Sequence, residues 1–339
     1  MSARAFVAGC AGPDLSAEER SFFREADPFG LILFRRNVVS PDQVRALTAA
    51  FREAVGRDDA PVLVDQEGGR VQRLGPPHWP RYPAGRAYGR ITRDAAASGR
   101  DPAWLGARLM AHDLRALGID VNCLPVLDVP VPGSHDVIGD RAYAEDPDEV
   151  ARLGGQAAAG LLAGGVLPVV KHVPGHGRAM ADSHLALPRV DASLEALRER
   201  DFRPFRALAH LPVAMSAHVV YEAIDPDRPA TTSPLVIGGI VRGEIGFDGL
   251  LLTDDLSMRA LSGDFRDRAE AALQAGCDVA LHCNGDLSEA RRVAEGSPRL
   301  AGPSLRRAEA ALALIRAEPD AFDPVDARLA LETALTAAA

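Results

Sequence analysis

The sequence predicts an α/β fold, a single (β/α)8 barrel of the TIM type, and three observations support this prediction. Eight short apolar runs recur along the 339 residues, each bounded by Gly, Pro, Asp or Asn. The runs are continuously apolar rather than alternating, which is typical of strands buried on both faces. Amphipathic segments of helical length separate them. Strands that alternate with helices pair in parallel, and eight such units favour a closed barrel over an open doubly wound sheet.

The expected elements follow in order along the chain. The strands are residues 5–10, 30–34, 61–65, 120–124, 167–172, 212–216, 250–253 and 278–282. The helices include residues 41–55, 102–117, 148–162, 193–208 and 259–275. The expected N-terminal caps, each followed directly by a proline, are Ser40, Asp101 and Asp146. The expected helix ends are marked by Gly56, Gly118, Gly164 and Gly276.

An open doubly wound sheet is the structural alternative. No G-x-G-x-x-G motif follows an early strand, and this motif is the commonest sign of a dinucleotide-binding sheet. After about residue 300 the sequence predicts one further helix, residues 304–317, and then an alanine-rich helical tail that adds no new core. We expect no second domain, so residues 1–339 are predicted to form one catalytic domain.

Composition and charge exclude several classes of protein. The net charge of −9 and the pI near 5.5 oppose binding to nucleic acid or to an anionic membrane, because such partners need clustered positive charge. No run approaches about 18 apolar residues, and the N-terminus lacks the roughly 7–15 apolar residues of an export signal. We therefore expect a cytoplasmic protein with no nucleic-acid or membrane partner. A monomer is the default expectation.

The cysteines indicate neither disulfides nor a lipid anchor. Residues 7–10 read VAGC, which resembles a lipoprotein cleavage box, but almost nothing apolar precedes Ala5, so a buried first strand fits better. No C-x-x-C motif is present. We interpret all four as reduced core thiols. They are Cys10, Cys123, Cys277 and Cys283.

Polar residues follow the predicted strands, at the positions where barrels of this type carry chemistry. They are Asp65, Asp128, Lys171, His172, His218, Asp254, Asp255, His282, Cys283 and Asn284. A lysine at a buried strand end needs an anionic or hydroxyl-rich partner, so Lys171 is a candidate site residue. Asp255, ahead of the sequence LSM, is interpreted instead as a helix cap.

The loop after the fifth predicted strand is rich in reactive groups. Residues 171–184 read KHVPGHGRAMADSH, with three histidines, an acid and two glycines. Glycines and small residues suit a mobile lid, here residues 173–184, that delivers a catalytic group. A zinc site is the rival interpretation, because His172 and His176 are four residues apart. Pro174 and Gly175 oppose the helix that would align those histidines, so we expect no metal and no other cofactor.

Three long segments carry a resemblance to a known family. They are DQEGGRVQR at residues 65–73, KH through DSH at residues 171–184, and TDDLSM at residues 253–258. Together, and in this order, they resemble the family 3 glycoside hydrolases, specifically the bacterial β-N-acetylhexosaminidases of cell-wall recycling. The resemblance covers most of the chain. Many members carry a second α/β domain that completes the active site, whereas this chain resembles the single-domain branch.

The resemblance implies a (β/α)8 barrel and a role for each matched residue. Asp254 matches the nucleophile, and Asp182 and His184 match a pair that handles the proton. The positions that match those holding the terminal sugar are Asp65, Arg73, Arg141, Lys171 and His172. After Arg141 the chain reads Ala-Tyr-Ala where the family more often has Ser-Phe-Gly, so the geometry of that loop stays open.

The implied activity is that of a retaining exo-β-N-acetylglucosaminidase. Its substrate would be a muropeptide fragment, N-acetylglucosamine (GlcNAc) linked to anhydro-N-acetylmuramic acid with or without peptide. Such an enzyme needs a carboxylate that attacks the anomeric carbon and an acid that protonates the leaving oxygen, typically about 5 Å apart. Asp254 would be the first. His184 titrates near neutrality without burial, and Asp182 would favour its protonated form and orient its ring.

Two alternatives remain open. A β-glucosidase or β-xylosidase of the same family would differ in its recognition of the substituent at the 2-position. A catalytically silent sugar-binding barrel is the alternative outside enzymes, and it predicts loss of the nucleophile or of the lid acid. Asp254, Asp182 and His184 are all present in the sequence, which favours an enzyme.

Overall fold

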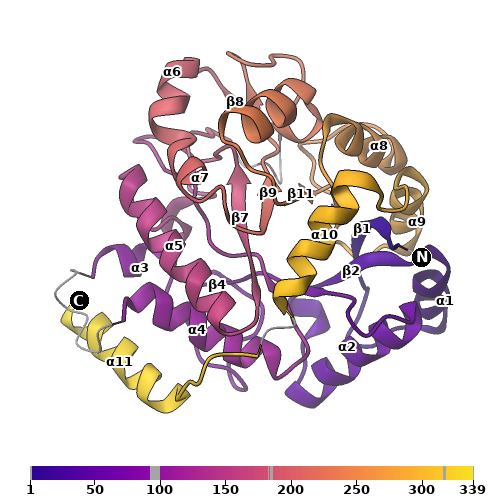
Figure 1. Cartoon of the computed structure of the whole chain (residues 1–339), viewed down its shortest axis with the longest axis horizontal. Coiled ribbons are helices and arrows are strands. Elements are labelled where there is room, and N and C mark those ends of the chain that lie inside the picture. The colour runs from indigo at the N-terminus through magenta and orange to yellow at the C-terminus, as the bar shows by residue number, and fades with distance from the viewer. Residues whose placement is uncertain (1, 92–99, 182, 184–185, 316–317, 339) are drawn as a thin grey trace.

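Eight parallel strands close into a barrel in the computed structural model of the chain (Figure 1). The structure describes residues 2–91, 100–181, 183, 186–315 and 318–338. The last barrel strand pairs with the first, so the open-sheet alternative is wrong and the predicted (β/α)8 barrel is confirmed. The barrel strands are β1 (Arg4–Gly9), β2 (Pro28–Leu33), β3 (Val62–Val64), β6 (Val121–Asn122), β7 (Leu167–Val173), β9 (Val213–Ser216), β11 (Leu250–Asp255) and β12 (Val279–His282).

Each predicted apolar run overlaps one of these strands, and the reason is burial on both faces. One set of side chains fills the barrel interior, for example Val7, Leu63 and Val169. The alternate set packs against the surrounding helices, for example Phe6 and Leu31. Two short hairpin strands, β4 (Gln66–Gly68) and β5 (Val71–Gln72), follow β3. A second small pair is formed by β8 (Arg189–Val190) and β10 (Val220–Tyr221).

The helices surround the barrel, and the predicted caps lie at their starts. The N-caps Ser40, Asp101 and Asp146 each accept a hydrogen bond from a backbone N–H of the first turn. Gly56 and Gly276 end their helices in the left-handed conformation, as predicted. The helices are α1 (Ala17–Ala26), α2 (Pro41–Val55), α3 (Gly85–Gly89), α4 (Pro102–Arg115), α5 (Pro147–Ala163), α6 (Leu194–Ala196), α7 (Arg203–Ala207), α8 (Phe265–Ala275), α9 (Leu287–Gly296), α10 (Gly302–Ile315) and α11 (Pro324–Ala337).

Two predicted helices differ from the structure. The segment 193–208 is split into α6, a π-helical turn over Leu197–Asp201 and α7. Pro204 lies in that segment, and a proline has no N–H with which to continue the helical bonding. The helix expected over 259–275 starts only at Phe265, capped by Asp264, because Gly263 turns the chain at a positive φ of 90°.

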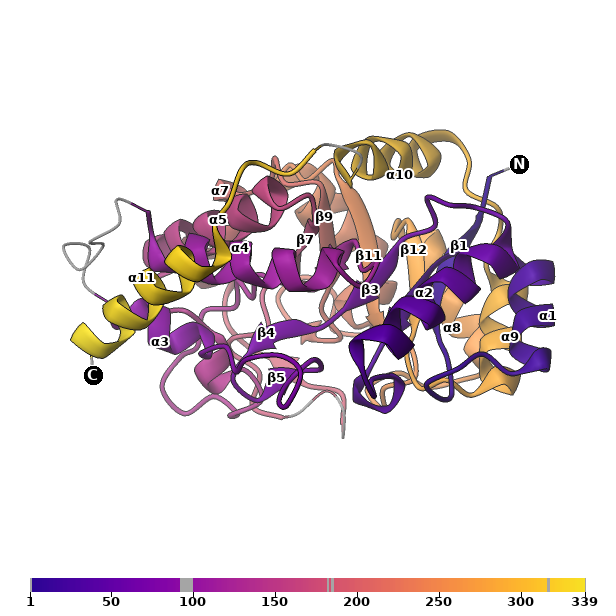
Figure 2. The same cartoon turned by 90° about the horizontal axis from the view of Figure 1, so that it is seen from below.

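Helix α10 closes the end of the barrel opposite to the strand ends that carry polar residues. Ala308 and Ala311 of α10 belong to the cluster that fills the barrel interior. Ser304 and Arg307 bind Asp278, which directly precedes β12. Figure 2 shows α10 across one end of the barrel and the β4 and β5 strands toward the other. The carboxyl ends of the strands therefore remain available for a site.

The C-terminal tail forms α11, which joins the main hydrophobic core rather than building a new one. Ala327, Leu331 and Ala334 are buried and belong to the main hydrophobic cluster. They are spaced by four and three residues, so they lie on one face of the helix, which packs against α4. The four cysteines are free and buried, as predicted. Among the described residues, no helix is long and apolar enough to cross a membrane.

Candidate active site

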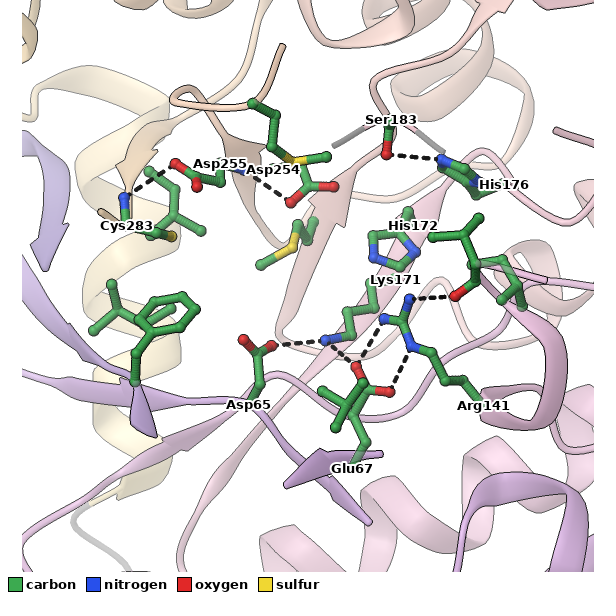
Figure 3. Close-up of a pocket in the computed structure, with 18 of the residues that line it drawn as sticks. Asp65, Glu67, Arg141, Lys171, His172, His176, Ser183, Asp254, Asp255 and Cys283 are labelled. Carbon is green, nitrogen blue, oxygen red and sulfur yellow. Dashed lines mark hydrogen bonds and ion pairs between the residues drawn. The ribbon is translucent and has the colours of Figure 1, made fainter. Parts of the chain in front are cut away.

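A cavity of about 240 Å³ opens at the carboxyl ends of the barrel strands (Figure 3). It contains every described residue that the sequence assigns to the site. Asp182 and His184 lie outside the described residues, although Ser183, between them in sequence, lines the cavity. The polar lining residues are Asp65, Glu67, Arg73, Arg141, Lys171, His172, His176, Ser183, Asp254 and Asp255.

The barrel brings these residues together from distant parts of the chain. Asp65 directly follows β3, Lys171 and His172 lie in β7, and Asp254 lies in β11. All eight barrel strands are parallel, so their carboxyl ends meet at one end of the barrel. His218 and His282, also strand-end residues, do not line the cavity. His218 binds Thr231 and the backbone of Asp255, and His282 binds Glu289.

Five charged side chains form a row of alternating sign along the floor of the cavity. Arg73 Nη2 donates to Asp65 Oδ2 at 2.9 Å, and Lys171 Nζ donates to Asp65 Oδ1 at 2.9 Å. Lys171 Nζ is also 2.6 Å from Glu67 Oε1. Arg141 completes the row through two bonds to Glu67, from Nε at 2.8 Å and from Nη2 at 2.9 Å. We call these five residues the charged row.

Burial and charge act in opposite directions on the row, and charge dominates. Burial disfavours the ammonium of Lys171, whose side chain is 2% exposed, but Asp65 and Glu67 raise its pKa above the ordinary value. Burial likewise disfavours the Glu67 carboxylate, yet Arg141 and Lys171 lower its pKa to about 2. The pKa of Asp65 is lowered for the same reason by Lys171 and Arg73. All three groups are therefore charged at neutral pH.

Glu67 is the member of the row that sequence reasoning missed. It lies in the DQEGGRVQR segment, two residues after Asp65, where an extended chain directs both side chains to the same face. The side chain of Gln66 points the other way and fixes the hairpin, because it accepts from the backbone N–H groups of Arg73 and Leu74. The spacing of two residues between Asp65 and Glu67 is the sequence signal that could have identified Glu67 as a site residue.

Arg141 owes its position to close backbone packing as well as to Glu67. It ends a short 3-10 turn, Gly139–Arg141, and its Nη1 donates to the carbonyl of Val137 at 3.1 Å. Helix α3 lies directly against this segment. A Cβ atom at Gly85 would overlap the carbonyl of Arg141, and one at Gly89 would overlap the carbonyl of Tyr143. With the Ala-Tyr-Ala sequence after it, Arg141 lines the cavity, and Tyr143 is buried against Tyr88.

Asp128 connects the histidines of β7 and of the following loop. Its Oδ2 lies 2.7 Å from His172 Nδ1, and its Oδ1 accepts from the backbone N–H of His176 at 2.6 Å. Burial alone would raise the pKa of this fully buried carboxyl, but His172 and the hydrogen bonds lower it to about 2. The ionised Asp128 therefore holds the His172 ring with its Nδ1–H inward, which leaves Nε2 for the cavity.

His176 continues the connection toward the predicted acid/base pair. Its Nε2 is 3.2 Å from the hydroxyl of Ser183, and both residues are buried. Burial and the neighbouring His172 lower the pKa of His176 to about 4, so this ring is neutral at physiological pH. His172 and His176 meet edge to face, with ring centroids 5.7 Å apart. Within the described part of the chain, no group of three or more His, Cys, Asp or Glu is placed to hold a metal.

The first part of the predicted lid belongs to the packed core. From Val173 to Ala179 every residue except Arg178 is buried, and the first exposed side chain is Met180, at 65%. A segment that closes over substrate would therefore start after Ala179 rather than at Val173. Three hydrogen bonds hold residues 173–179 in place: Tyr221 Oη to Gly175 O at 2.5 Å, Arg178 Nε to Asp201 Oδ2 at 2.7 Å and His135 N to Ala179 O at 2.9 Å.

Asp254 lies on the opposite wall from the charged row (Figure 3). Its Oδ1 accepts from the backbone N–H of Asp255 at 2.8 Å. The interpretation of Asp255 as a helix cap is wrong, because a turn rather than a helix follows it. Asp255 instead accepts from the backbone N–H groups of Ser257 and Cys283, which fixes the end of β11 against the end of β12. Apolar side chains complete the cavity: Ile32, Phe34, Met215, Met258 and Leu281.

Comparison with known proteins agrees with this architecture. Residues 10–301 match the family model described as the glycosyl hydrolase family 3 N terminal domain. The β-hexosaminidase of Methylococcus capsulatus is 43% identical over 317 residues, which is 92% of each chain. The chain therefore belongs to glycosyl hydrolase family 3, as the three sequence motifs predict, and it is a glycoside hydrolase.

Solved structures give the same result. The native NagZ of Neisseria gonorrhoeae superposes with a TM-score of 0.85 at 32% identity, covering 100% of this chain and 99% of that one. The same protein is also known in complex with N-trifluoroacetyl-D-glucosamine. A family 3 β-N-acetylglucosaminidase from Paenibacillus sp. FPU-7 has a TM-score of 0.82 at 34% identity. This chain spans 63% of the length of the Paenibacillus protein.

Proposed function

We propose that the chain is a retaining exo-β-N-acetylglucosaminidase that releases terminal β-linked GlcNAc from peptidoglycan fragments through a covalent glycosyl-enzyme. The broader class, a glycoside hydrolase with β-N-acetylhexosaminidase activity, follows from the family and from the relatives named β-hexosaminidase. The observation that carries the finer proposal is the cavity, in which Asp254 faces the charged row (Figure 3).

The size and lining of the cavity suit one terminal sugar. Its volume of about 240 Å³ is below the roughly 300–1,000 Å³ of pockets that hold drug-sized ligands. The charged row offers donors and acceptors for ring hydroxyls, and charged hydrogen bonds of this kind orient a ligand as well as bind it. The apolar side chains on the other wall suit the methyl of an acetamido group. The complex of the Neisseria protein with N-trifluoroacetyl-D-glucosamine supports the same ligand class.

The proposed reaction has two steps. Asp254 attacks the anomeric carbon while His184, in its protonated form, gives its proton to the departing oxygen. Neutral His184 then takes a proton from a water molecule as that water attacks the glycosyl-enzyme, which restores Asp254 with net retention. Asp182 would favour the imidazolium form of His184 and orient its ring. Asp65, Arg73, Arg141, Lys171 and His172 would hold the sugar.

The proposed setting is cell-wall recycling in the cytoplasm. The aglycone would be anhydro-N-acetylmuramic acid, with or without peptide. In this proposal, residues 1–339 act as one catalytic domain and as a monomer, without a cofactor and without nucleic-acid or membrane partners. The acidic net charge of −9 supports the last point.

Two variants and a matched control test the proposal. Asp254→Asn should lower turnover of an aryl N-acetyl-β-glucosaminide by at least about 10³-fold, because no nucleophile remains. His184→Ala should harm substrates with poor leaving groups far more than activated ones, since only the former need a proton. Asp42→Asn, whose side chain is 92% exposed on α2, should behave as wild type. Equal losses with both leaving groups in His184→Ala would rule out its role as the acid.

The same assay separates the alternatives. Faster hydrolysis of aryl β-glucosides or β-xylosides than of the N-acetylated substrate would indicate the related glycosidases. Binding of GlcNAc by calorimetry without any product would indicate a silent sugar-binding barrel. A slow fluorinated GlcNAc donor should leave its sugar on the peptide that contains Asp254, as detected by mass spectrometry. Attachment elsewhere would contradict the assignment of the nucleophile.

A further inference from the structure

Within the charged row, Glu67 lies between Lys171 and Arg141. Its side chain is 4% exposed. Oε1 faces both cations, at 2.6 Å from Lys171 Nζ and 2.9 Å from Arg141 Nη2, while Oε2 accepts from Arg141 Nε at 2.8 Å. Figure 3 shows the carboxylate between the two cationic groups. The Arg141 contact is a fork-to-fork pair, which constrains the plane of the guanidinium as well as its distance.

The hydrogen-bonding capacity of these groups limits what each can offer a ligand. A carboxylate has about four acceptor positions; on Glu67, Arg141 fills two of them by hydrogen bonds, and the Lys171 ammonium lies 2.6 Å from Oε1 as an ion pair. An ammonium has three donors; on Lys171, Asp65 takes one by a hydrogen bond, and Glu67 lies beside the ammonium as an ion pair. A guanidinium has five, and Glu67 and the carbonyl of Val137 take three of those on Arg141, which leaves two.

The charges of these groups also indicate that Glu67 acts on Lys171 and Arg141. Lys171 and Arg141 both carry a positive charge and repel each other, and this repulsion lowers the pKa of Lys171. Only an anion between the two cations lets them share one cavity wall. Glu67 can serve as this anion because its backbone is fixed in the β4–β5 hairpin, which Gln66 and Asn122 hold from the buried side.

We infer that Glu67 is a positioning residue, which sets the separation of Lys171 and Arg141 and directs their remaining donors at the terminal sugar. The inference rests on the proposed function, in that Lys171 and Arg141 hold the sugar. Glu67 acts through these cations rather than on the ligand. The acceptors of Glu67 face Lys171 and Arg141, so Glu67 contributes to the affinity for the sugar through these two cations.

The test compares Glu67→Gln and Glu67→Asp with wild type. Both should weaken GlcNAc binding, measured by calorimetry and by competitive inhibition, and Glu67→Gln should weaken it about 10- to 100-fold. KM for the aryl substrate should rise in parallel, and kcat should fall less. The matched control is Glu19→Gln, because Glu19 is a buried carboxylate that caps α1 away from the cavity. The thermal unfolding midpoint of Glu19→Gln should fall, while its KM for the aryl substrate should stay as in wild type.

A second variant separates action through the cations from direct contact. In an Arg141→Ala background, Glu67→Gln should cost a clearly smaller factor than it costs in wild type, because one of its two partners is gone. The same loss in both backgrounds would identify Glu67 as a direct ligand and overturn the inference. GlcNAc affinity within about twofold of wild type in Glu67→Gln would also overturn it.

Two further outcomes are decisive. If Glu67→Gln does not fold, Glu67→Asp keeps the charge, but its carboxylate is one carbon shorter and cannot reach both cations. Wild-type affinity in that variant would overturn the inference. If wild type itself binds no GlcNAc, the proposed function fails, whereas wild-type binding that Glu67→Gln leaves intact refutes the positioning role alone.

Discussion

At the scale of single residues, Asp128 has the most demanding position in the site. It is fully buried, and it binds the His172 ring and the backbone N–H groups of His172 and His176. An amide at this position would place a donor against one of these donors. His172 would lose the partner that fixes its tautomer and orientation, as happens when a carboxylate that orients a catalytic histidine is replaced.

We therefore predict that Asp128→Asn lowers kcat/KM for an aryl N-acetyl-β-glucosaminide by about 10- to 100-fold and destabilises the fold by about 1–3 kcal/mol. Steady-state kinetics and urea unfolding measure the two effects. Asp113→Asn is the matched control, because Asp113, on α4, is a half-buried carboxylate that binds Tyr82 outside the cavity lining. Unchanged kinetics in Asp128→Asn would show that His172 does not depend on this carboxylate.

The sequence predicted which strand ends would carry the site, but not how the residues pair there. Asp65 and Lys171 were recognisable because charged groups at buried strand ends need partners. Their partners lie far away in sequence. Glu67 and Arg141 are 74 residues apart, and Asp128 and His172 are 44 apart. Closure of the barrel sets these distances, and no local pattern encodes them.

At the scale of elements, local sequence signals predicted where helices begin better than where they are interrupted. The serine and aspartate caps of α2, α4 and α5 were visible because capping is a property of a few adjacent residues. The break around Pro204 and the late start of α8 after Gly263 were not predicted, although both residues are visible in the sequence. Helix α11 was expected, but its burial was not, because alanines supply little apolar contrast between the two faces of a helix.

The burial of helix α11 can be tested directly. Leu331 is 4% exposed and packs toward α4, whereas Leu329 on the same helix is 64% exposed. Leu331→Ala should destabilise the protein by about 2 kcal/mol or more, and Leu329→Ala by less than about 0.5 kcal/mol. Thermal or urea unfolding gives both values. Similar values for the two variants would mean that α11 does not pack on the core in solution.

At the scale of the whole molecule, buried histidines make stability depend on pH. His176 faces Asp128, His172 and Ser183, and burial together with His172 lowers its pKa from 6.5 to about 4. Between these values the unfolded chain binds a proton that the folded chain does not. Stability therefore falls as pH falls through this window. Burial raises the pKa of Asp201 to about 6, and this group acts in the opposite direction.

We predict that His176 alone contributes a loss of about 2 kcal/mol in the free energy of unfolding between pH 7 and pH 5. His176→Asn should remove this part of the pH dependence, while substitution of the exposed His78 by Asn should leave it as in wild type. Urea unfolding at the two pH values measures it. The prediction fails if His176→Asn and wild type lose the same free energy between pH 7 and pH 5.

The charged row also has a consequence for long-range electrostatics. Its three cations and two anions pair with one another at short distances in a buried site, where dissolved salt screens weakly, so the row as a whole carries a single positive charge. The excess negative charge of the molecule is carried elsewhere. An uncharged sugar can therefore exchange its hydration shell for the row without displacing a counterion, and its affinity should be nearly independent of ionic strength. Any salt dependence of the reaction would report on charged groups of the proposed aglycone.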